Sequence, residues 1–132
     1  MVAYIYPSKK MKNANSVGLL KKLWEIREYY SSKLDDAEYF SVSYTEWKSG
    51  KKKYLKEFKQ IAKSIMTLDK SEAPSIKGKI NHLEDLVREI EDSENSSLMR
   101  TIKISSSIFF LVDFCDYLAK TLIRYHKRKK SK

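Results

Sequence analysis

Lysines repeat at helical spacing in residues 48–63, which read KSGKKKYLKEFKQIAK. Seven of these sixteen residues are lysines and one is a glutamate, so the segment carries a charge of +6. Spacings of four, three and four align four of the lysines over about 16 Å on one side of a helix: Lys52, Lys56, Lys59 and Lys63. Such a stripe can contact a row of phosphates and predicts a site for duplex DNA.

The stripe also allows a simpler interpretation, as a solvated face that keeps the protein soluble. Four like charges in a row repel one another, so a counter-charge is expected. The acidic segment 64–99, with a net charge of −4, could supply it within the chain. Three further lysines near the start of the same helix favour phosphate as the counter-charge: Lys48, Lys51 and Lys53.

Catalytic and metal-binding side chains are scarce in this chain. The two histidines, His82 and His126, and the single cysteine, Cys115, cannot form a ligand set at a zinc-site spacing. The glycines are isolated, which excludes a glycine-rich phosphate loop. We therefore predict that the protein is not an enzyme and holds no metal or cofactor. Cys115 is predicted to be a small buried hydrophobe.

Composition points to one compact helical domain with basic arms. The 132 residues carry a net charge of +10 and are 42% hydrophobic, which is enough for one core. Three glycines and two prolines allow few tight turns, which favours long helices and an all-α fold. The longest apolar run, at 108–112, is too short to span a membrane, and the N-terminal residues lack a secretory-signal pattern.

Hydrophobic periodicity predicts where the helices lie. We expect helices over about 15–34, 50–69, 76–92 and 98–126. In the second of them, apolar residues opposite the lysines follow the i, i+3, i+4, i+7 rule, so a core-facing helix would carry the stripe. Three serines at 105–107 indicate either a close helix contact or a break, so the last stretch counts as one helix or two.

The first expected helix has a wide apolar face. Its apolar residues fall on one half of a helical wheel: Val17, Leu20, Leu23, Trp24, Tyr30 and Leu34. Arg27 falls inside this face, where an arginine must either pair with an acid across an interface or reach a phosphate. Because the later helices can bury their apolar faces against one another, we expect the apolar face of the first helix to contact neighbouring subunits of an assembly.

The organisation of the whole chain resembles a known family of structural proteins. It has a basic, aromatic-rich helical arm of about fifty residues, a hinge at SYTEWKSGKKKYLKEF and a helical bundle of about eighty residues. In this order, and in its bias towards Lys, Ile, Tyr and Ser, the chain resembles the major coat proteins of filamentous archaeal viruses of the lipothrixvirus type.

This resemblance implies a fold and a role. Such coat proteins fold as an antiparallel four-helix bundle preceded by an extended basic N-terminal helical arm. Residues 1–49 would form the arm, 50–127 the bundle and 128–132 a basic tail. The fourth bundle helix would come from a break near Ser105 or from residues 36–47.

The resemblance also implies partners and contacts. Pairs of related coat proteins wrap double-stranded DNA in A-form within a lipid-enveloped helical filament. The partners would be DNA, a second coat protein, neighbouring subunits and envelope lipid, in a virion assembled in the host cytoplasm. Basic residues of the arm and stripe would face phosphate: Lys9, Lys10, Lys12, Lys21, Lys22, Arg27, Lys48, Lys51, Lys52, Lys53, Lys56, Lys59 and Lys63.

Two other functions are compatible with the same residues. A cellular nucleoid-type or regulatory protein could bind DNA non-specifically as a small dimer. A basic amphipathic protein could instead lie on an anionic membrane. Binding to liposomes without binding to DNA would distinguish the membrane protein from the other two.

Overall fold

The computed structural model describes residues 14–92 and 97–130, and every regular element in these ranges is helical. The all-α prediction is therefore confirmed. The elements are α1 (Ala14–Ser31), α2 (Leu34–Glu38), α3 (Tyr44–Gly50), a π-helical turn η1 (Lys51–Leu55), α4 (Lys56–Leu68), α5 (Ala73–Asp92) and α6 (Ser97–Lys130).

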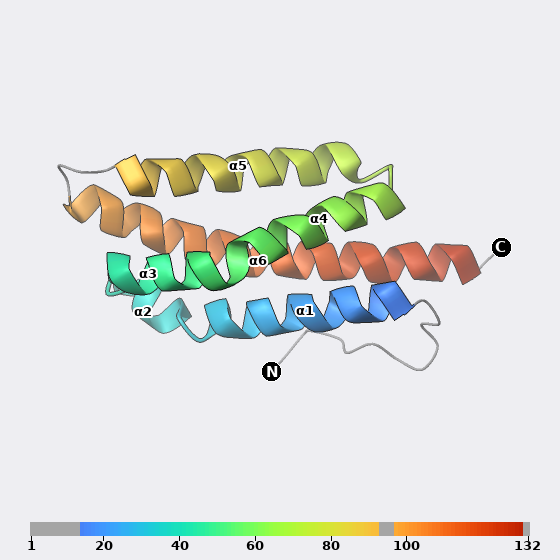
Figure 1. The fold of residues 1–132 in the computed structure, drawn as a ribbon, viewed down its shortest axis with the longest axis horizontal. Coiled ribbons are helices and arrows are strands. Elements are labelled where there is room, and N and C mark those ends of the chain that lie inside the picture. Colours follow the sequence, from blue (N-terminus) through green and yellow to red (C-terminus); the bar gives the residue numbers. More distant parts are fainter. Residues whose placement is uncertain (1–13, 93–96, 131–132) are drawn as a thin grey trace.

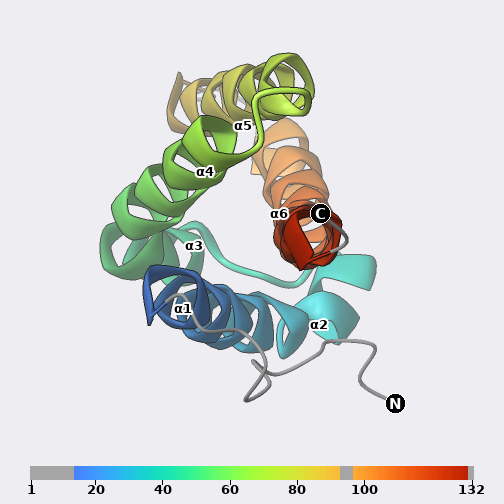
Figure 2. The same cartoon turned by 90° about the vertical axis from the view of Figure 1, so that its right-hand side faces the viewer.

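The long helices run side by side in alternating directions. Figure 1 shows α1, the α3–α4 segment, α5 and α6 each reversing the direction of the one before. Seen from the side in Figure 2, they surround a common core in the order α1, α4, α5, α6. Helix α6 also contacts α2, α3 and α4, so it is the element on which the rest of the chain packs.

The hinge expected near Gly50 is not present, because α3, η1 and α4 follow one another without a break. The backbone of Gly50 is ordinary helix, with φ −63° and ψ −41°. A cap starts this long segment, since the Ser43 side chain accepts a hydrogen bond from the Glu46 N–H at 3.1 Å. One helical rod therefore joins residues that the sequence assigned to an arm and to a bundle.

Gly50 is needed for close packing between α3 and α1. A Cβ atom at this position would lie 2.9 Å from the ring edge and hydroxyl of Tyr29. The Tyr29 ring is itself held between Tyr30 and Tyr54, with ring centroids 5.0 Å and 4.6 Å away. The absence of a side chain thus lets the two helices approach each other.

Replacing Gly50 with alanine is expected to lower the free energy of unfolding by about 1–2 kcal/mol, because the packed Tyr29 ring must move. Ordinary helix propensity predicts the opposite, a gain of about 1 kcal/mol. Chemical denaturation of Gly50→Ala, Tyr29→Ala and the double variant tests this. In the Tyr29→Ala protein, Gly50→Ala should instead raise the free energy of unfolding. If Gly50→Ala lowered it equally with and without Tyr29, the explanation would be contradicted.

Helix α6 is one continuous helix, so the serines at 105–107 mark a close contact and not a break. Ser105 and Ser107 are buried, and the Trp47 indole N–H donates to the Ser107 hydroxyl at 3.2 Å. Small side chains here let α3 lie against α6. Cys115 is also fully buried on this helix, as predicted.

The apolar face of α1 is part of the protein's own core. Leu20, Leu23 and Tyr30 are at most 3% exposed, and Ile26 joins them in the core cluster. Trp24 and Leu34 pack against this cluster, whereas Val17 is half-buried. The expectation that this face contacts neighbouring subunits is therefore wrong for Leu20, Leu23 and Tyr30, because α1 packs on α6 of the same chain.

The first turns of α2 and α5 contain residues that suit the start of a helix. Asp35 and Asp36 lie in the first turn of α2, and Lys33 precedes it without a side-chain cap. Pro74 lies inside the first turn of α5. The missing N–H of proline costs nothing there, because the first helical N–H groups have no intrahelical partner.

Candidate nucleic-acid interface

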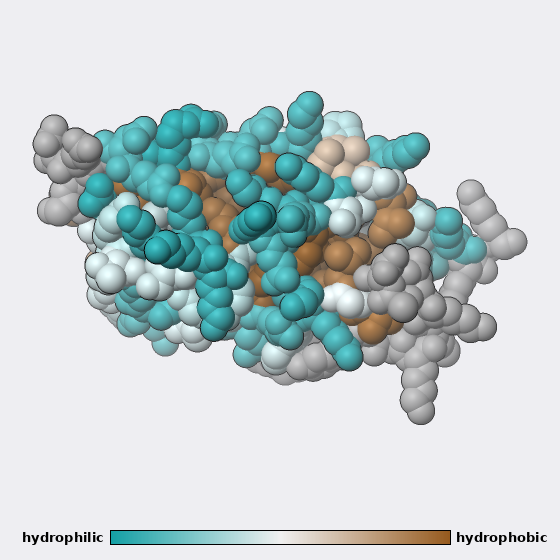
Figure 3. Space-filling model, in the orientation of Figure 1, coloured by the Kyte–Doolittle hydropathy of each residue, from teal (hydrophilic) through white to brown (hydrophobic). Residues whose placement is uncertain are grey.

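Four lysines form an exposed ridge on the outward side of the α3–α4 segment: Lys48, Lys52, Lys56 and Lys63. We call these residues the outer lysine ridge. Among the residues that the structure describes, no carboxylate forms an ion pair with any of them. Figure 3, in the orientation of Figure 1, shows hydrophilic side chains over much of the face that α3 and α4 form.

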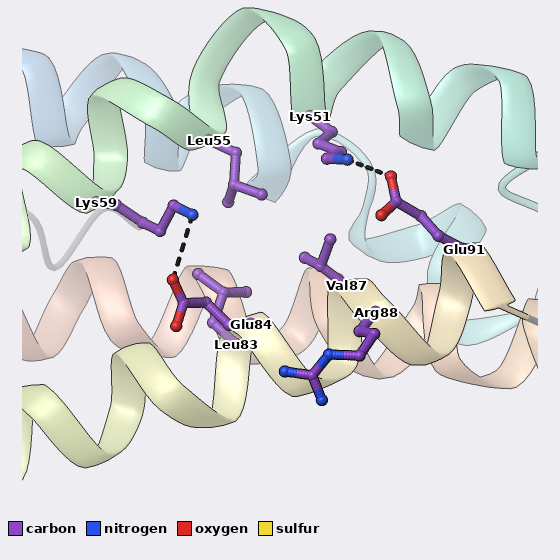
Figure 4. A pocket seen from close by; sticks show the side chains of 8 residues that line it. All are labelled: Lys51, Leu55, Lys59, Leu83, Glu84, Val87, Arg88 and Glu91. Atoms are coloured by element: carbon purple, nitrogen blue, oxygen red, sulfur yellow. Dashed lines mark hydrogen bonds and ion pairs between the residues drawn. The ribbon is translucent and has the colours of Figure 1, made fainter.

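Two other lysines of residues 48–63 have partners on α5. Lys51 pairs with Glu91, and Lys59 lies 3.4 Å from Glu84. Figure 4 shows both pairs bridging a groove of about 370 Å³. For Lys51 and Lys59 the expected counter-charge is therefore supplied within the chain, by acidic residues of α5.

Lys22 on α1 and Lys53 in η1 lie beside aromatic and acidic groups. Lys22 is 3.5 Å from Glu57, and the Lys53 ammonium lies 5.3 Å from the centre of the Tyr54 ring. Both line an open hollow of about 670 Å³ whose other walls mix aromatic and acidic residues: Trp24, Glu25, Glu28, Tyr29, Tyr54 and Glu57. Acidic groups make this hollow a poorer phosphate site than the ridge. Lys21 is exposed to solvent on α1.

Arg27 has an acidic partner within the chain. Its Nε donates to Asp116 Oδ1 at 2.5 Å, and its Nη2 donates to Asp116 Oδ2 at 3.4 Å. Of the two roles considered for Arg27, the structure shows the carboxylate pair, between α1 and α6 of one molecule and not between subunits. Lys9, Lys10 and Lys12 lie outside the described residues.

A second basic surface, which the predicted site omits, lies on α6. Lys120, Arg124 and Lys127 are exposed and follow one another at spacings of four and three, so they share one side of the helix. Figure 2 places α6 across the core from α4. The same spacing rule that identified the first stripe could have found these residues, but their position next to a basic tail concealed them.

Asp69 fixes the end of α6 to the junction between α4 and α5. It is 4% exposed and accepts hydrogen bonds from Arg128 Nη2 and Ser71 Oγ, each at 2.7 Å. Burial alone would raise the pKa of Asp69, but these hydrogen bonds outweigh burial and lower it below the ordinary value. Arg128, expected to begin a free tail, is part of α6 and of this contact.

The lowered pKa of Asp69 predicts a contribution to stability that acid removes. It should be fully present above the ordinary aspartate pKa of about 3.9 and be lost as the pH falls through the lower folded-state value. Asp69→Asn should lower the free energy of unfolding at pH 7 by about 1–3 kcal/mol. The free energy of unfolding of the Asp69→Asn protein should fall less than that of the unchanged protein between pH 5 and 2, which is about the range in which such groups titrate. Thermal unfolding over this range provides the measurement, and parallel profiles would contradict the assignment.

The described parts of the chain contain neither a membrane-spanning helix nor a cluster of metal ligands. Within them, no helix is long and apolar enough to cross a bilayer. No three histidine, cysteine, aspartate or glutamate side chains in those parts gather as metal ligands.

Comparisons with models of known protein families, with curated proteins and with solved structures gave no match. The resemblance to coat proteins of filamentous viruses therefore stays a prediction from the sequence. The support for a function comes from the arrangement of the two basic surfaces, the outer lysine ridge and the basic residues of α6.

Proposed function

We propose that this protein binds double-stranded DNA without sequence preference, through phosphate contacts made by the outer lysine ridge. The observation that carries the proposal is the separation of the lysines at 48–63 into two kinds. Those near α5 pair with its carboxylates, while Lys52, Lys56 and Lys63 point outward with no ion-pair partner among the described residues. A polyanion supplies the counter-charge that this ridge lacks.

The ridge is held in place by the core beneath it. Leu55, Phe58, Ile61 and Ile65 occupy the opposite side of the same helical segment and are buried. The ridge therefore spans about 22 Å, from Lys48 to Lys63, on a support that does not need to fold on binding. Lysine suits this task, because its ammonium contacts a phosphate as a point charge without reading a base.

A finer form of the proposal is a structural coat protein. In this form the alternating helices are an antiparallel four-helix bundle in which α1 supplies the fourth helix. The protein wraps A-form DNA together with a second related chain, and the units assemble into an enveloped helical filament. The positive charge on the ridge and on α6 supports wrapping, because α4 and α6 lie on opposite sides of the core in Figure 2.

A second candidate is a cellular nucleoid-type or regulatory DNA-binding dimer. The burial of the α1 apolar face within the chain favours it, since a large expected assembly surface is already used. Electron microscopy of the protein with long linear DNA separates the two candidates. Regular helical filaments support the coat protein, whereas scattered complexes or loops support the dimer.

Binding to duplex DNA is expected to weaken steeply with salt and to be insensitive to base sequence. Each lysine–phosphate contact contributes about −0.9 to the slope of log K against log salt concentration, so four ridge contacts predict a slope of about −3.6 or steeper. Fluorescence anisotropy with two unrelated duplexes between 50 and 200 mM salt measures this. Affinity independent of salt would exclude the proposed function.

A further inference from the structure

The basic residues in the C-terminal half of α6 face away from the core. Lys120, Arg124 and Lys127 are exposed and share one side of the helix. Leu118 and Leu122 are fully buried on the opposite side. We call the three exposed residues the α6 basic row. It spans about 10 Å along the helix axis, at 1.5 Å per residue.

The α6 basic row lacks a counter-charge from the protein. In the described parts of the chain, no carboxylate forms an ion pair with Lys120 or Arg124. Asp116 lies one turn before Lys120 but pairs with Arg27 of α1. Asp113 is exposed on the same side, about 10 Å before Lys120 along the helix axis. A phosphate group can therefore supply the missing counter-charge, as for the outer lysine ridge.

The α6 basic row and the outer lysine ridge face opposite directions. Figure 2 shows α4 and α6 on opposite sides of the core. On α4, Lys56 of the ridge is exposed, whereas Phe58, about 200° further around the helix, is fully buried. Contacting helices lie about 8–10 Å apart and each is about 10–12 Å wide, so the two basic surfaces are about 25 Å apart.

One straight duplex cannot contact both surfaces of a single molecule. To pass around the protein from one surface to the other, its axis has to turn through about 180° over about 70 Å, or about 20 base pairs. DNA on the nucleosome turns by about 45° in 10 base pairs, so even that curvature gives only about 90° over this path. Two separate segments of duplex therefore fit the two surfaces better than one bent segment.

We propose that the α6 basic row is a second phosphate-binding site, and that one molecule holds two segments of duplex DNA, one on this row and one on the outer lysine ridge. Arg124 suits the site, because a guanidinium can bind a phosphate with two parallel hydrogen bonds. The inference rests on the proposed function and adds a second DNA segment to it. In a coat protein the two segments are neighbouring turns of the wrapped duplex, because many units share each turn.

A capture assay with the full chain tests this inference. One duplex is tethered to beads, and a fluorescent duplex of unrelated sequence is added together with the protein. The fluorescent duplex should be retained, and the retained amount should rise and then fall as the protein concentration increases. It should fall because, at excess protein, separate molecules occupy each duplex. A plateau at excess protein would overturn the proposal, since it would mean that bound molecules join the duplexes by pairing with one another.

Replacing Lys120 and Arg124 with glutamine tests the assignment of the second site. Two lost phosphate contacts correspond to about 30-fold in affinity at 0.15 M salt, so retention of the fluorescent duplex should fall about tenfold or more. Affinity for a single duplex, measured by fluorescence anisotropy, should change less than about threefold, because the outer lysine ridge is intact. Circular dichroism verifies that the variant folds.

The control replaces Lys22 and Lys51 with glutamine, which changes the net charge equally but removes lysines that pair with Glu57 and Glu91. Equal retention by the control and the α6 variant would overturn the assignment of the second site. If a single duplex bound but no second duplex were retained, the inference would fail and the proposed function would stand. If the unchanged protein bound no duplex at all, the proposed function itself would fail.

Discussion

Replacing Lys52, Lys56 and Lys63 together with glutamine is expected to lower the affinity for duplex DNA about 100-fold at 0.15 M salt. Each lost phosphate contact removes about 0.9 from the salt slope, and at this salt concentration three contacts correspond to about two powers of ten in affinity. The side chains are exposed and form no ion pair in the described structure, so the fold should be unaffected. Fluorescence anisotropy over a salt series gives both quantities, and the slope should become shallower by about 2.7.

The chain provides a control with the same change in charge. Lys22, Lys51 and Lys59 pair with Glu57, Glu91 and Glu84. Replacing these three lysines with glutamine also removes three positive charges, but from groups already neutralised within the protein. If both triple variants lost affinity equally, net charge would explain the binding and the ridge would have no special role.

Replacing Phe58 with alanine is expected to lower the free energy of unfolding by about 3–5 kcal/mol. Phe58 is fully buried, and its ring meets Phe114 of α6 edge to face with centroids 5.0 Å apart. The surrounding helices cannot close the cavity completely, because Ile65 and Leu118 are also fully buried in the same cluster. A loss of this size could leave the protein partly unfolded at 37 °C.

Urea denaturation at 25 °C measures the loss, and Tyr39→Ala is the matched control. Tyr39 is also aromatic, but its side chain is 77% exposed, so truncation should change the stability by less than about 0.5 kcal/mol. If Phe58→Ala cost no more than Tyr39→Ala, the α4–α6 contact would not be part of a packed core. Affinity for DNA should survive in the fraction of Phe58→Ala that remains folded, because the substitution does not touch the ridge.

The spacing of residues predicted the helix around the lysine stripe well. Apolar residues such as Phe58 and Ile61 recur at helical spacing opposite the lysines, and the structure buries them. This works because a helix has a fixed angular period, so the sequence determines which side chains share a face. The same rule predicted α5 and a helical stretch at α6, apart from the exact ends, but it left open whether that stretch is one helix or two.

The sequence could not predict which lysines would be neutralised. Lys56 and Lys59 differ by three positions, yet Lys59 meets Glu84 and Lys56 points outward. Which side of α4 faces α5 depends on how the helices dock. The π-helical turn at Lys51–Leu55 also rotates the later side chains about the helix axis relative to the earlier ones. A helical wheel drawn at constant pitch does not contain that shift.

The sequence by itself determined that the chain forms long amphipathic helices, that its positive charge is grouped, and that no catalytic or metal-binding set is expected. Only the tertiary structure decided what each face meets. It buried the Leu23 side of α1 against α6 and gave Arg27 the carboxylate of Asp116, 89 residues away. The physical reason is that periodicity shows that a face must be buried, whereas the partner that covers it depends on contacts between residues distant in sequence.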